Sequence, residues 1–350
     1  MIRLRECVKN MQGYVPGAPA RDAESVKLNQ NENRYPPSSK ALAAASGAAK
    51  DLALYPESTS LELRKAAAKV CGTAPERVMA ANGSDEMLRI FFQAFCDPGD
   101  EVVAFYPSYT YYATLAAMQD VRYRLIEFTE QFLLPEKLDI GDAKLVFLPN
   151  PNAPTGTLFP ESEIRRLAES APDCMVVIDE AYIAFAPSGS DSIHLIDEYP
   201  NIAVTRTLSK SHSLAGLRVG LGFAREEVLV ELEKVRDYYN LDRVAAAAGA
   251  AALLDQEWLA DTSGRIVASR DEMIGKLRGL GLKVYPSHAN FFLLDCRTPA
   301  EAERLFKGLG ERNVLVRYFN SRRLDSCLRV SVGTDADMTR LWNALTALIH

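Results

Sequence analysis

Residues 205–220, Thr-Arg-Thr-Leu-Ser-Lys-Ser-His-Ser-Leu-Ala-Gly-Leu-Arg-Val-Gly, follow a short apolar run and decide how the rest of the chain is interpreted. Lys210 lies among hydroxyl side chains, and Arg218 follows eight residues later between two glycines. A lysine amine can form a Schiff base with an aldehyde, while the hydroxyls of Thr207 and Ser209 and the forked guanidinium of Arg218 suit phosphate oxygens. The stretch is therefore a candidate anchor for an aldehyde cofactor that bears a phosphate. The alternative is a solvated lysine in a polar loop, since most lysines are exposed.

The composition is that of an ordinary globular chain. Its 350 residues exceed the usual size of one hydrophobic core, so we expect two domains, and a hydrophobic content of 48% is enough to bury both. The net charge of −6 provides no broad basic field, which argues against nucleic acid and favours small molecules as partners. The six cysteines form no C-x-x-C pair and the four histidines are far apart, so we expect neither disulfides nor a metal site.

Residues 1–35 are polar and rich in turn formers, and the stretch 28–37 at their end cannot be helical through Pro36 and Pro37. We expect residues 1–35 to form an arm. No apolar run has the length of a membrane span, and the first residues lack the apolar core of a signal peptide. We therefore expect a cytoplasmic protein without a membrane partner.

The middle of the chain alternates between helical patterns and short apolar runs. Such runs, apolar on both faces and separated by helices, predict a mostly parallel sheet covered on both sides, which is an α/β fold. The predicted strands are residues 78–81, 102–105, 145–148, 175–178 and 202–205.

After about residue 225 a long helical region runs through residue 254, and a smaller α+β pattern follows. This pattern predicts helices near 266–279 and 299–309, strands at 283–285, 291–294, 314–316 and 328–331, and a closing helix. We divide the chain into the arm at 1–35, a large domain at 36–245 and a small C-terminal domain at 246–350.

Ligands of parallel sheets collect at the carboxyl ends of the strands, so the residues that follow each strand are the candidates for binding and catalysis. Ser84 and Asp85 follow a glycine at a helix start, where free backbone N–H groups bind phosphate, although simple N-capping is the commoner use. Tyr109 belongs to a group of four tyrosines within residues 106–112, which suits stacking on a planar ring or ordinary packing. The turn at 149–156 can present an asparagine amide inward.

Asp179 comes directly after a buried apolar run. A carboxylate there is costly unless it meets a cation, and a protonated pyridine nitrogen is such a partner. Tyr182, three residues later, could reach the phenolic oxygen of the same ring.

Together these segments resemble the fold-type I pyridoxal-phosphate aminotransferases, most closely the histidinol-phosphate aminotransferases, over nearly the whole chain. The matching segments are 14–17, 28–32, 54–57, 82–86, 150–156, 179–182, 206–210, 215–218, 289–291 and 328–334. The resemblance implies the family's two-domain fold, pyridoxal 5′-phosphate as cofactor and a homodimer.

The resemblance also implies roles for single residues. Lys210 binds the cofactor covalently and moves the substrate proton, Asp179 pairs with the pyridine nitrogen and Tyr182 holds the phenolic oxygen. The expected cofactor-binding residues are Tyr55 from the partner subunit, Ser84, Asp85, Tyr109, Asn152, Asp179, Tyr182, Thr207, Ser209, Lys210 and Arg218. The expected substrate-binding residues are Tyr14, Asn31, Arg317 and Arg329, with Arg329 on the carboxylate and Arg317 near a phosphate. Many relatives carry asparagine where this chain has Ala153, and Asn152 is our substitute for it.

The implied reaction is a ping-pong transamination between glutamate and imidazole-acetol phosphate, giving histidinol phosphate in histidine biosynthesis. An aromatic aminotransferase and a phosphothreonine-type decarboxylase on the same scaffold are the alternatives. A nucleotide-binding module without catalysis would require a glycine-rich G-x-G-x-x-G or P-loop motif after an early strand, and the sequence has neither.

Overall fold

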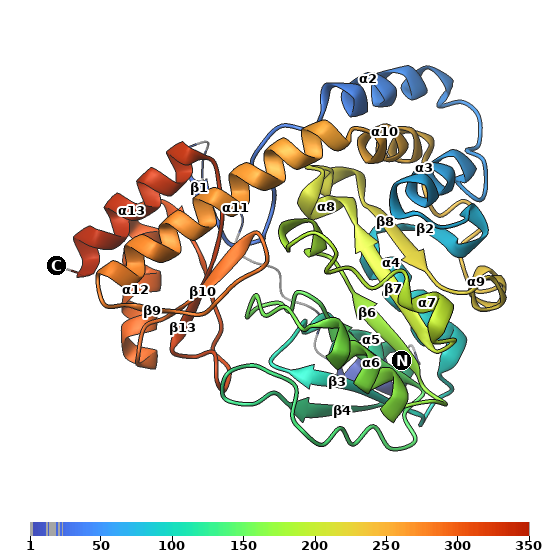
Figure 1. The fold of residues 1–350 in the computed structure, drawn as a ribbon, viewed down its shortest axis with the longest axis horizontal. Coiled ribbons are helices and arrows are strands. Elements are labelled where there is room, and N and C mark those ends of the chain that lie inside the picture. The colour runs from blue at the N-terminus through green and yellow to red at the C-terminus, as the bar shows by residue number, and fades with distance from the viewer. Residues whose placement is uncertain (1–2, 12, 14–18, 20–21, 23, 350) are drawn as a thin grey trace.

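The computed structural model describes residues 3–349 apart from 12, 14–18, 20, 21 and 23. A seven-stranded sheet forms its centre (Figure 1). In spatial order its strands are β2 Val78–Asn82, β8 Val219–Phe223, β7 Ile202–Thr207, β6 Met175–Asp179, β5 Leu145–Pro149, β3 Glu101–Tyr106 and β4 Arg122–Glu127. The five strands predicted from the apolar runs are thus confirmed, and the α/β fold class with them.

Two strands of this sheet were not predicted. The edge strand β4 is polar on much of its length, and β8 contains Gly220 and Gly222, so neither gives an apolar run. β8 pairs antiparallel with both β2 and β7, while the other pairs of the sheet are parallel. Because β8 runs in reverse, its first residue lies at the edge where the other strands have their carboxyl ends.

Helices cover both faces of the central sheet. Alternate residues of one strand enter different cores: Val103 packs in the core on one face and Ala104 in the core on the other. This explains why the strands are apolar without alternation. One face is covered by α4 Gly83–Phe95, α5 Tyr111–Gln119 and α9 Glu226–Glu233, and the other by α3 Leu61–Cys71, α6 Glu161–Ser170 and α10 Arg243–Leu254, on which α2 Ser39–Ala48 packs.

A second, antiparallel sheet belongs to the C-terminal part of the chain. Its strands are β12 Arg317–Tyr318, β13 Cys327–Ser331, β10 Phe291–Asp295 and β9 Lys283–Val284, and its helices are α11 Gln256–Gly279, α12 Pro299–Glu311 and α13 Asp335–Ile349. The predicted strand at 314–316 is shorter: β11 Val314–Leu315 pairs with β1 Val26–Lys27 of the N-terminal segment. The predicted boundary after residue 245 falls inside α10, and the three-part division of the chain stays a prediction.

The remaining helical segments are short. They are α1 Glu6–Asn10, α7 Leu195–Glu198, α8 Leu208–Ser211, η1 Ala49–Asp51, η2 Pro75–Arg77, η3 Ile183–Phe185 and η4 Ala215–Leu217. Within the described part of the chain, no helix has both the length and the apolar character needed to cross a membrane.

Candidate active site

A cavity of about 280 Å³ lies where the carboxyl ends of the central strands meet residues of the second sheet. Most of the predicted site residues line it although they are distant in sequence. They are Asn31, Ser84, Asp85, Tyr109, Asp179, Tyr182, Thr207, Ser209, Lys210, Arg218, Arg317 and Arg329. The convergence follows from the topology, because parallel strands bring the residues after their carboxyl ends to one edge.

Lys210 lies on α8, the short helix that begins directly after β7. Thr207 caps this helix, since its Oγ1 accepts a hydrogen bond from the Ser209 backbone N–H at 3.2 Å. Lys210 Nζ donates to the backbone carbonyl of Gln30 at 3.2 Å. Burial and, to a lesser extent, the nearby Arg329 guanidinium together lower the pKa of the Lys210 amine to about 8. A neutral amine, which is the nucleophilic form, is therefore accessible close to neutral pH.

Asp179 is the last residue of β6 and is buried. Its Oδ2 accepts a hydrogen bond from the Tyr112 hydroxyl at 2.8 Å, and its Oδ1 accepts one from Thr205 Oγ1 at 3.1 Å. Burial nevertheless raises the pKa of Asp179 to about 6, because the two hydrogen bonds do not replace the lost hydration. The carboxylate is thus suited to a cationic partner in the cavity.

A third group of side chains forms an anion-binding corner beside the start of α4. Arg218 precedes β8 and has a left-handed backbone conformation, with φ 54°. Its Nη1 donates to Ser209 Oγ at 3.2 Å, and its Nη2 to Asp85 Oδ2 at 3.0 Å. A Cβ at Gly83 would lie 2.5 Å from Arg218 Nη2, and one at Gly220 would lie 2.2 Å from the Gly83 carbonyl carbon. Both glycines are therefore required for this close approach of backbone and guanidinium.

Two tyrosines lie at the side of the cavity. The Tyr109 hydroxyl donates to Asp85 Oδ1 at 3.0 Å, and the Tyr109 ring lies edge-on to Tyr112 with 5.5 Å between centroids. The Tyr182 hydroxyl accepts a hydrogen bond from Asn31 Nδ2 at 2.9 Å. Its ring packs edge-on against Phe291 at 5.1 Å. Both aromatic rings are thus fixed by polar and apolar neighbours.

Two arginines enter the cavity from the second sheet. Arg317 and Arg329 are directly opposite each other in the antiparallel pair β12 and β13. Phe319 lies close to both, with its ring centroid 5.4 Å from the Arg317 guanidinium carbon and 5.5 Å from that of Arg329. Arg329 Nη2 also donates to the Asn29 carbonyl at 3.1 Å. The result is a strongly cationic wall.

Two predicted site residues lie away from the cavity, and a third lies outside the described residues. Asn152 is buried, and its Nδ2 donates to the Pro107 carbonyl and to Thr155 Oγ1; of the described residues, Ala153 lines the cavity and Asn152 does not. Tyr55 is 76% exposed on the outer surface. Tyr14 lies outside the described residues. The roles expected of these three residues stay predictions.

Sequence reasoning missed several residues that hold the site in shape. Tyr112 and Thr205 hold Asp179, and the only available signal for Tyr112 was its place in the tyrosine-rich segment. Glu180 is fully enclosed, and its Oε2 accepts hydrogen bonds from Nε and Nη2 of Arg206 at 2.9 and 2.8 Å. This ion pair joins the residue that follows Asp179 at the end of β6 to the end of β7, the strand that precedes Lys210. A glutamate after one strand end and an arginine at the next were visible in the sequence, but their pairing required the strand order.

The model of the aminotransferase class I and II family matches residues 23–345. A curated protein of Geotalea daltonii named histidinol-phosphate aminotransferase is 45% identical, with 99% of this chain and 100% of that protein covered. A protein of the same name from Crocosphaera subtropica is 38% identical, with 99% of each covered.

Solved structures give the same result. A histidinol-phosphate aminotransferase from Sinorhizobium meliloti, in complex with pyridoxal-5′-phosphate, superposes with a TM-score of 0.90 at 26% identity and covers 100% of this chain and 98% of its own. An L-threonine-O-3-phosphate decarboxylase from Porphyromonas gingivalis has a TM-score of 0.81 at 23% identity, covering 92% of this chain and 98% of its own. The second likeness is at the level of the fold.

Proposed function

Because the chain belongs to the aminotransferase class I and II family, we propose that it transfers an amino group between glutamate and imidazole-acetol phosphate, giving 2-oxoglutarate and histidinol phosphate in histidine biosynthesis. The observation that carries this proposal is the cationic wall of Arg317 and Arg329 in the same cavity as Lys210. The reaction needs one pocket that accepts both a dicarboxylate and a phosphate monoester. The curated relatives at 42 to 45% identity, which bear the name histidinol-phosphate aminotransferase, support the same assignment.

The residues present fit pyridoxal 5′-phosphate, the cofactor of this family. The corner formed by the start of α4, Ser209 and Arg218 offers N–H and hydroxyl donors and a guanidinium for a phosphate. Asp179, whose pKa burial raises to about 6, offers a carboxylate that a pyridine nitrogen would stabilise. When bound, the cofactor supplies an aldehyde that condenses with amines and a ring that withdraws electrons from the substrate Cα.

The chain's own groups then have separate tasks. Lys210 Nζ would take the proton from the substrate Cα and return it at the carbonyl carbon of the cofactor. Asp179 would keep the pyridine nitrogen protonated, and the hydrogen bonds from Tyr112 and Thr205 hold its carboxylate in place. Tyr109 would cover the ring face, and Tyr182 would donate to the phenolic oxygen. Glu180 and Arg206 fix the two strand ends from which these groups project.

The two arginines divide the substrate anions between them. A guanidinium matches a carboxylate or a phosphate through two parallel hydrogen bonds. Arg329 holds the anion nearer the reacting carbon, and Arg317 helps to hold the distal one. Such a charge-assisted contact contributes about 1.5–3 kcal/mol, enough to distinguish a phosphate ester from the corresponding alcohol.

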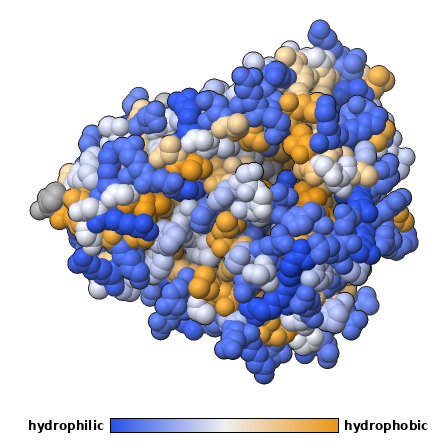
Figure 2. All heavy atoms as spheres, in the orientation of Figure 1, coloured by the Kyte–Doolittle hydropathy of each residue, from blue (hydrophilic) through white to orange (hydrophobic). Residues whose placement is uncertain are grey.

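We also propose a homodimer in which Tyr55 reaches the cofactor phosphate of the partner subunit. The face that carries Tyr55 is unusually apolar for a surface: Leu52, Leu54, Tyr55 and Tyr238 are each at least 65% exposed. Figure 2 shows apolar atoms exposed near α2 and α10, at its upper right. Tyr55 stacks on Tyr239 with 4.5 Å between centroids.

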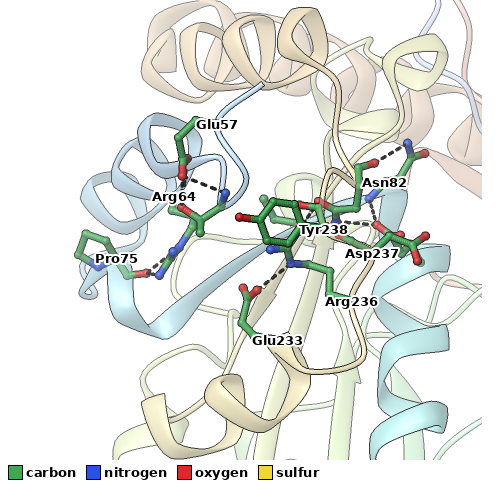
Figure 3. A network of polar contacts seen from close by, with 12 residues as sticks. Glu57, Arg64, Pro75, Asn82, Glu233, Arg236, Asp237 and Tyr238 are labelled. Atoms are coloured by element: carbon green, nitrogen blue, oxygen red, sulfur yellow. Dashed lines mark hydrogen bonds and ion pairs between the residues drawn. The ribbon is translucent and has the colours of Figure 1, made fainter. Parts of the chain in front are cut away.

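Figure 3 shows a network of polar contacts around Tyr238, one of the exposed residues of this face. Arg236 Nε donates to Glu233 Oε2 at 2.8 Å, and Arg64 Nη2 donates to the Pro75 carbonyl at 2.8 Å. Asn82 Nδ2 donates to the Asn240 carbonyl at 3.2 Å, which ties the segment before α10 to the start of α4. A preformed apolar face suits association of two copies.

Absorbance of the purified protein tests the proposal in two steps. Glutamate should convert the bound cofactor from its aldehyde form to its amine form, and imidazole-acetol phosphate should convert it back. Release of CO₂ from a phosphothreonine-type substrate, or faster reaction with aromatic amino acids, would favour one of the alternatives instead. We assign the reaction to the cytoplasm, in keeping with the six free cysteines.

A further inference from the structure

Three consecutive residues of the N-terminal segment form hydrogen bonds with three residues that line the cavity, Arg329, Lys210 and Tyr182. The Asn29 carbonyl accepts a hydrogen bond from Arg329 Nη2, and the Gln30 carbonyl accepts one from Lys210 Nζ. The Asn31 side chain donates to the Tyr182 hydroxyl. The segment therefore contacts Arg329 of the second sheet and two residues that follow strands of the central sheet, Tyr182 after β6 and Lys210 after β7.

Asn31 is held in a single orientation. Ser331 Oγ accepts a hydrogen bond from the Asn31 backbone N–H at 2.9 Å, so its own hydrogen is available for Asn31 Oδ1, also at 2.9 Å. Asn290 Nδ2 donates to the Asn31 carbonyl at 2.9 Å. Because Oδ1 is taken by Ser331, the amide NH₂ must face Tyr182. Asn31 is only 1% exposed and has φ 56°, a conformation that asparagine tolerates better than most residues.

This contact decides what the Tyr182 hydroxyl can do. A tyrosine hydroxyl can accept one hydrogen bond and donate another, and accepting one makes it a stronger donor. The turn at 150–156 presents a methyl group at Ala153, while the Asn152 amide donates to Pro107 and Thr155. The asparagine amide that contacts Tyr182 is therefore supplied by Asn31 of the N-terminal segment, and not by the turn at 150–156.

We propose that Asn31 is a positioning residue for Tyr182: its amide orients the Tyr182 hydroxyl so that the hydroxyl hydrogen serves the phenolic oxygen of the cofactor. The proposal rests on the proposed function, and it gives Asn31 a role different from direct substrate binding. A hydrogen bond to the phenolic oxygen favours its anionic form. Loss of the Asn31 amide should therefore let the bound cofactor keep its proton to higher pH.

The test follows the absorbance of the cofactor-loaded protein as a function of pH. Asn31→Asp keeps the size of the side chain and the acceptor for Ser331, but replaces the donor to Tyr182 with an acceptor. Asn31→Gly removes the amide without adding charge and suits the positive φ, so it serves if the first variant folds poorly. We expect both to raise the midpoint of the spectral titration by about 0.5 to 1 pH unit, as for loss of one hydrogen bond.

Tyr182→Phe provides the decisive background. If Asn31 acts through Tyr182, adding Asn31→Gly to Tyr182→Phe moves the midpoint no further. Equal shifts in both backgrounds would overturn the proposal, because Asn31 would then act on the cofactor directly. An unchanged midpoint combined with a raised KM for histidinol phosphate would overturn it in favour of substrate binding.

Asn33→Asp is the matched control. Asn33 lies on the same segment, and its Nδ2 donates to the Ser211 carbonyl at 3.1 Å rather than to a cavity residue. Asn33→Asp introduces the same charge two residues from Asn31, and the midpoint of its spectral titration should equal that of the parent. A shift as large as that of Asn31→Asp would overturn the proposal. A parent protein that bound no cofactor or did not react with glutamate would contradict the proposed function instead.

Discussion

Arg317 on β12 is the direct cross-strand partner of Arg329 on β13, so two guanidinium groups face the same cavity from neighbouring positions. Like charges directly opposite each other in a sheet are destabilising. Phe319 lies beside both groups. The unfavourable pairing of Arg317 with Arg329 is explained if the site binds anionic substrates, because a bound anion offsets the repulsion between the two guanidinium groups.

Arg317→Ala should lower kcat/KM for histidinol phosphate roughly tenfold to a hundredfold, because one charge-assisted contact contributes about 1.5–3 kcal/mol. The effect on histidinol, which lacks the phosphate, should be small. Arg329→Lys should instead slow the reaction with glutamate, since an ammonium cannot form the paired hydrogen bonds. Arg322→Ala is the control, because that side chain is 71% exposed and pairs with Glu127. A phosphate preference unchanged by Arg317→Ala would mean that Arg317 does not bind the substrate phosphate.

Lys210→Ala should reduce the rate of transamination by at least about 10²-fold. Loss of a general acid or base typically costs about 10²-fold to 10⁴-fold in rate. The phosphate-binding corner is unchanged in this variant, so cofactor should still bind without a covalent link. Turnover and cofactor retained after dialysis would be measured together. Near-normal turnover would refute the assignment of Lys210.

The stability of the cofactor-free protein should depend on Asp179 between pH 4 and pH 7. The folded-state pKa of about 6 exceeds the ordinary aspartate pKa of 3.8, so the folded state binds the proton more tightly and its stability falls as pH rises through this window. A rise of this size corresponds to about 3 kcal/mol. Asp179→Asn should lack this pH dependence. Denaturant unfolding of parent and variant at several pH values measures it, and parallel curves would argue against a buried, strained carboxylate.

The homodimer can be tested by mixing two defective variants. We expect a species of about twice 38.6 kDa in sedimentation experiments. Tyr55→Ala should weaken cofactor binding, and Lys210→Ala should be inactive. If Tyr55 serves the partner's site, a mixed dimer has one site with both residues intact, and activity at low cofactor concentration should return on mixing. No recovery after subunit exchange would mean that Tyr55 acts within its own subunit or not at all.

The sequence was most informative where burial on both faces produces apolar runs. Such runs identified β6 and β7, and the residues after them gave Asp179 and Lys210. It was least informative for β8, whose Gly220 is required because any Cβ would meet the Gly83 carbonyl carbon at 2.2 Å. Where two distant segments approach closely, the sequence shows a glycine at the point of contact. It does not show which other segment packs against that glycine.

Support of the site by distant residues was also invisible in the sequence. The hydrogen bond from Tyr112 to Asp179 spans 67 residues, and the one from Asn31 to Tyr182 spans 151. No local pattern encodes such pairs, because they depend on strand order and on the packing of the second sheet. Resemblance to a family supplied the expected role of Asn152, which the fold places with its amide toward Pro107.

The central claim is that the enzyme transfers an amino group to and from a phosphate ester. The most direct measurement compares kcat/KM of the parent for histidinol phosphate, histidinol and phenylalanine with the same amino acceptor, 2-oxoglutarate. We predict that histidinol phosphate is preferred over histidinol by at least about tenfold, as expected from one charge-assisted contact to the phosphate, and that phenylalanine is a poorer substrate than histidinol phosphate. Phenylalanine as the better substrate, or equal values for histidinol and its phosphate, would contradict the account.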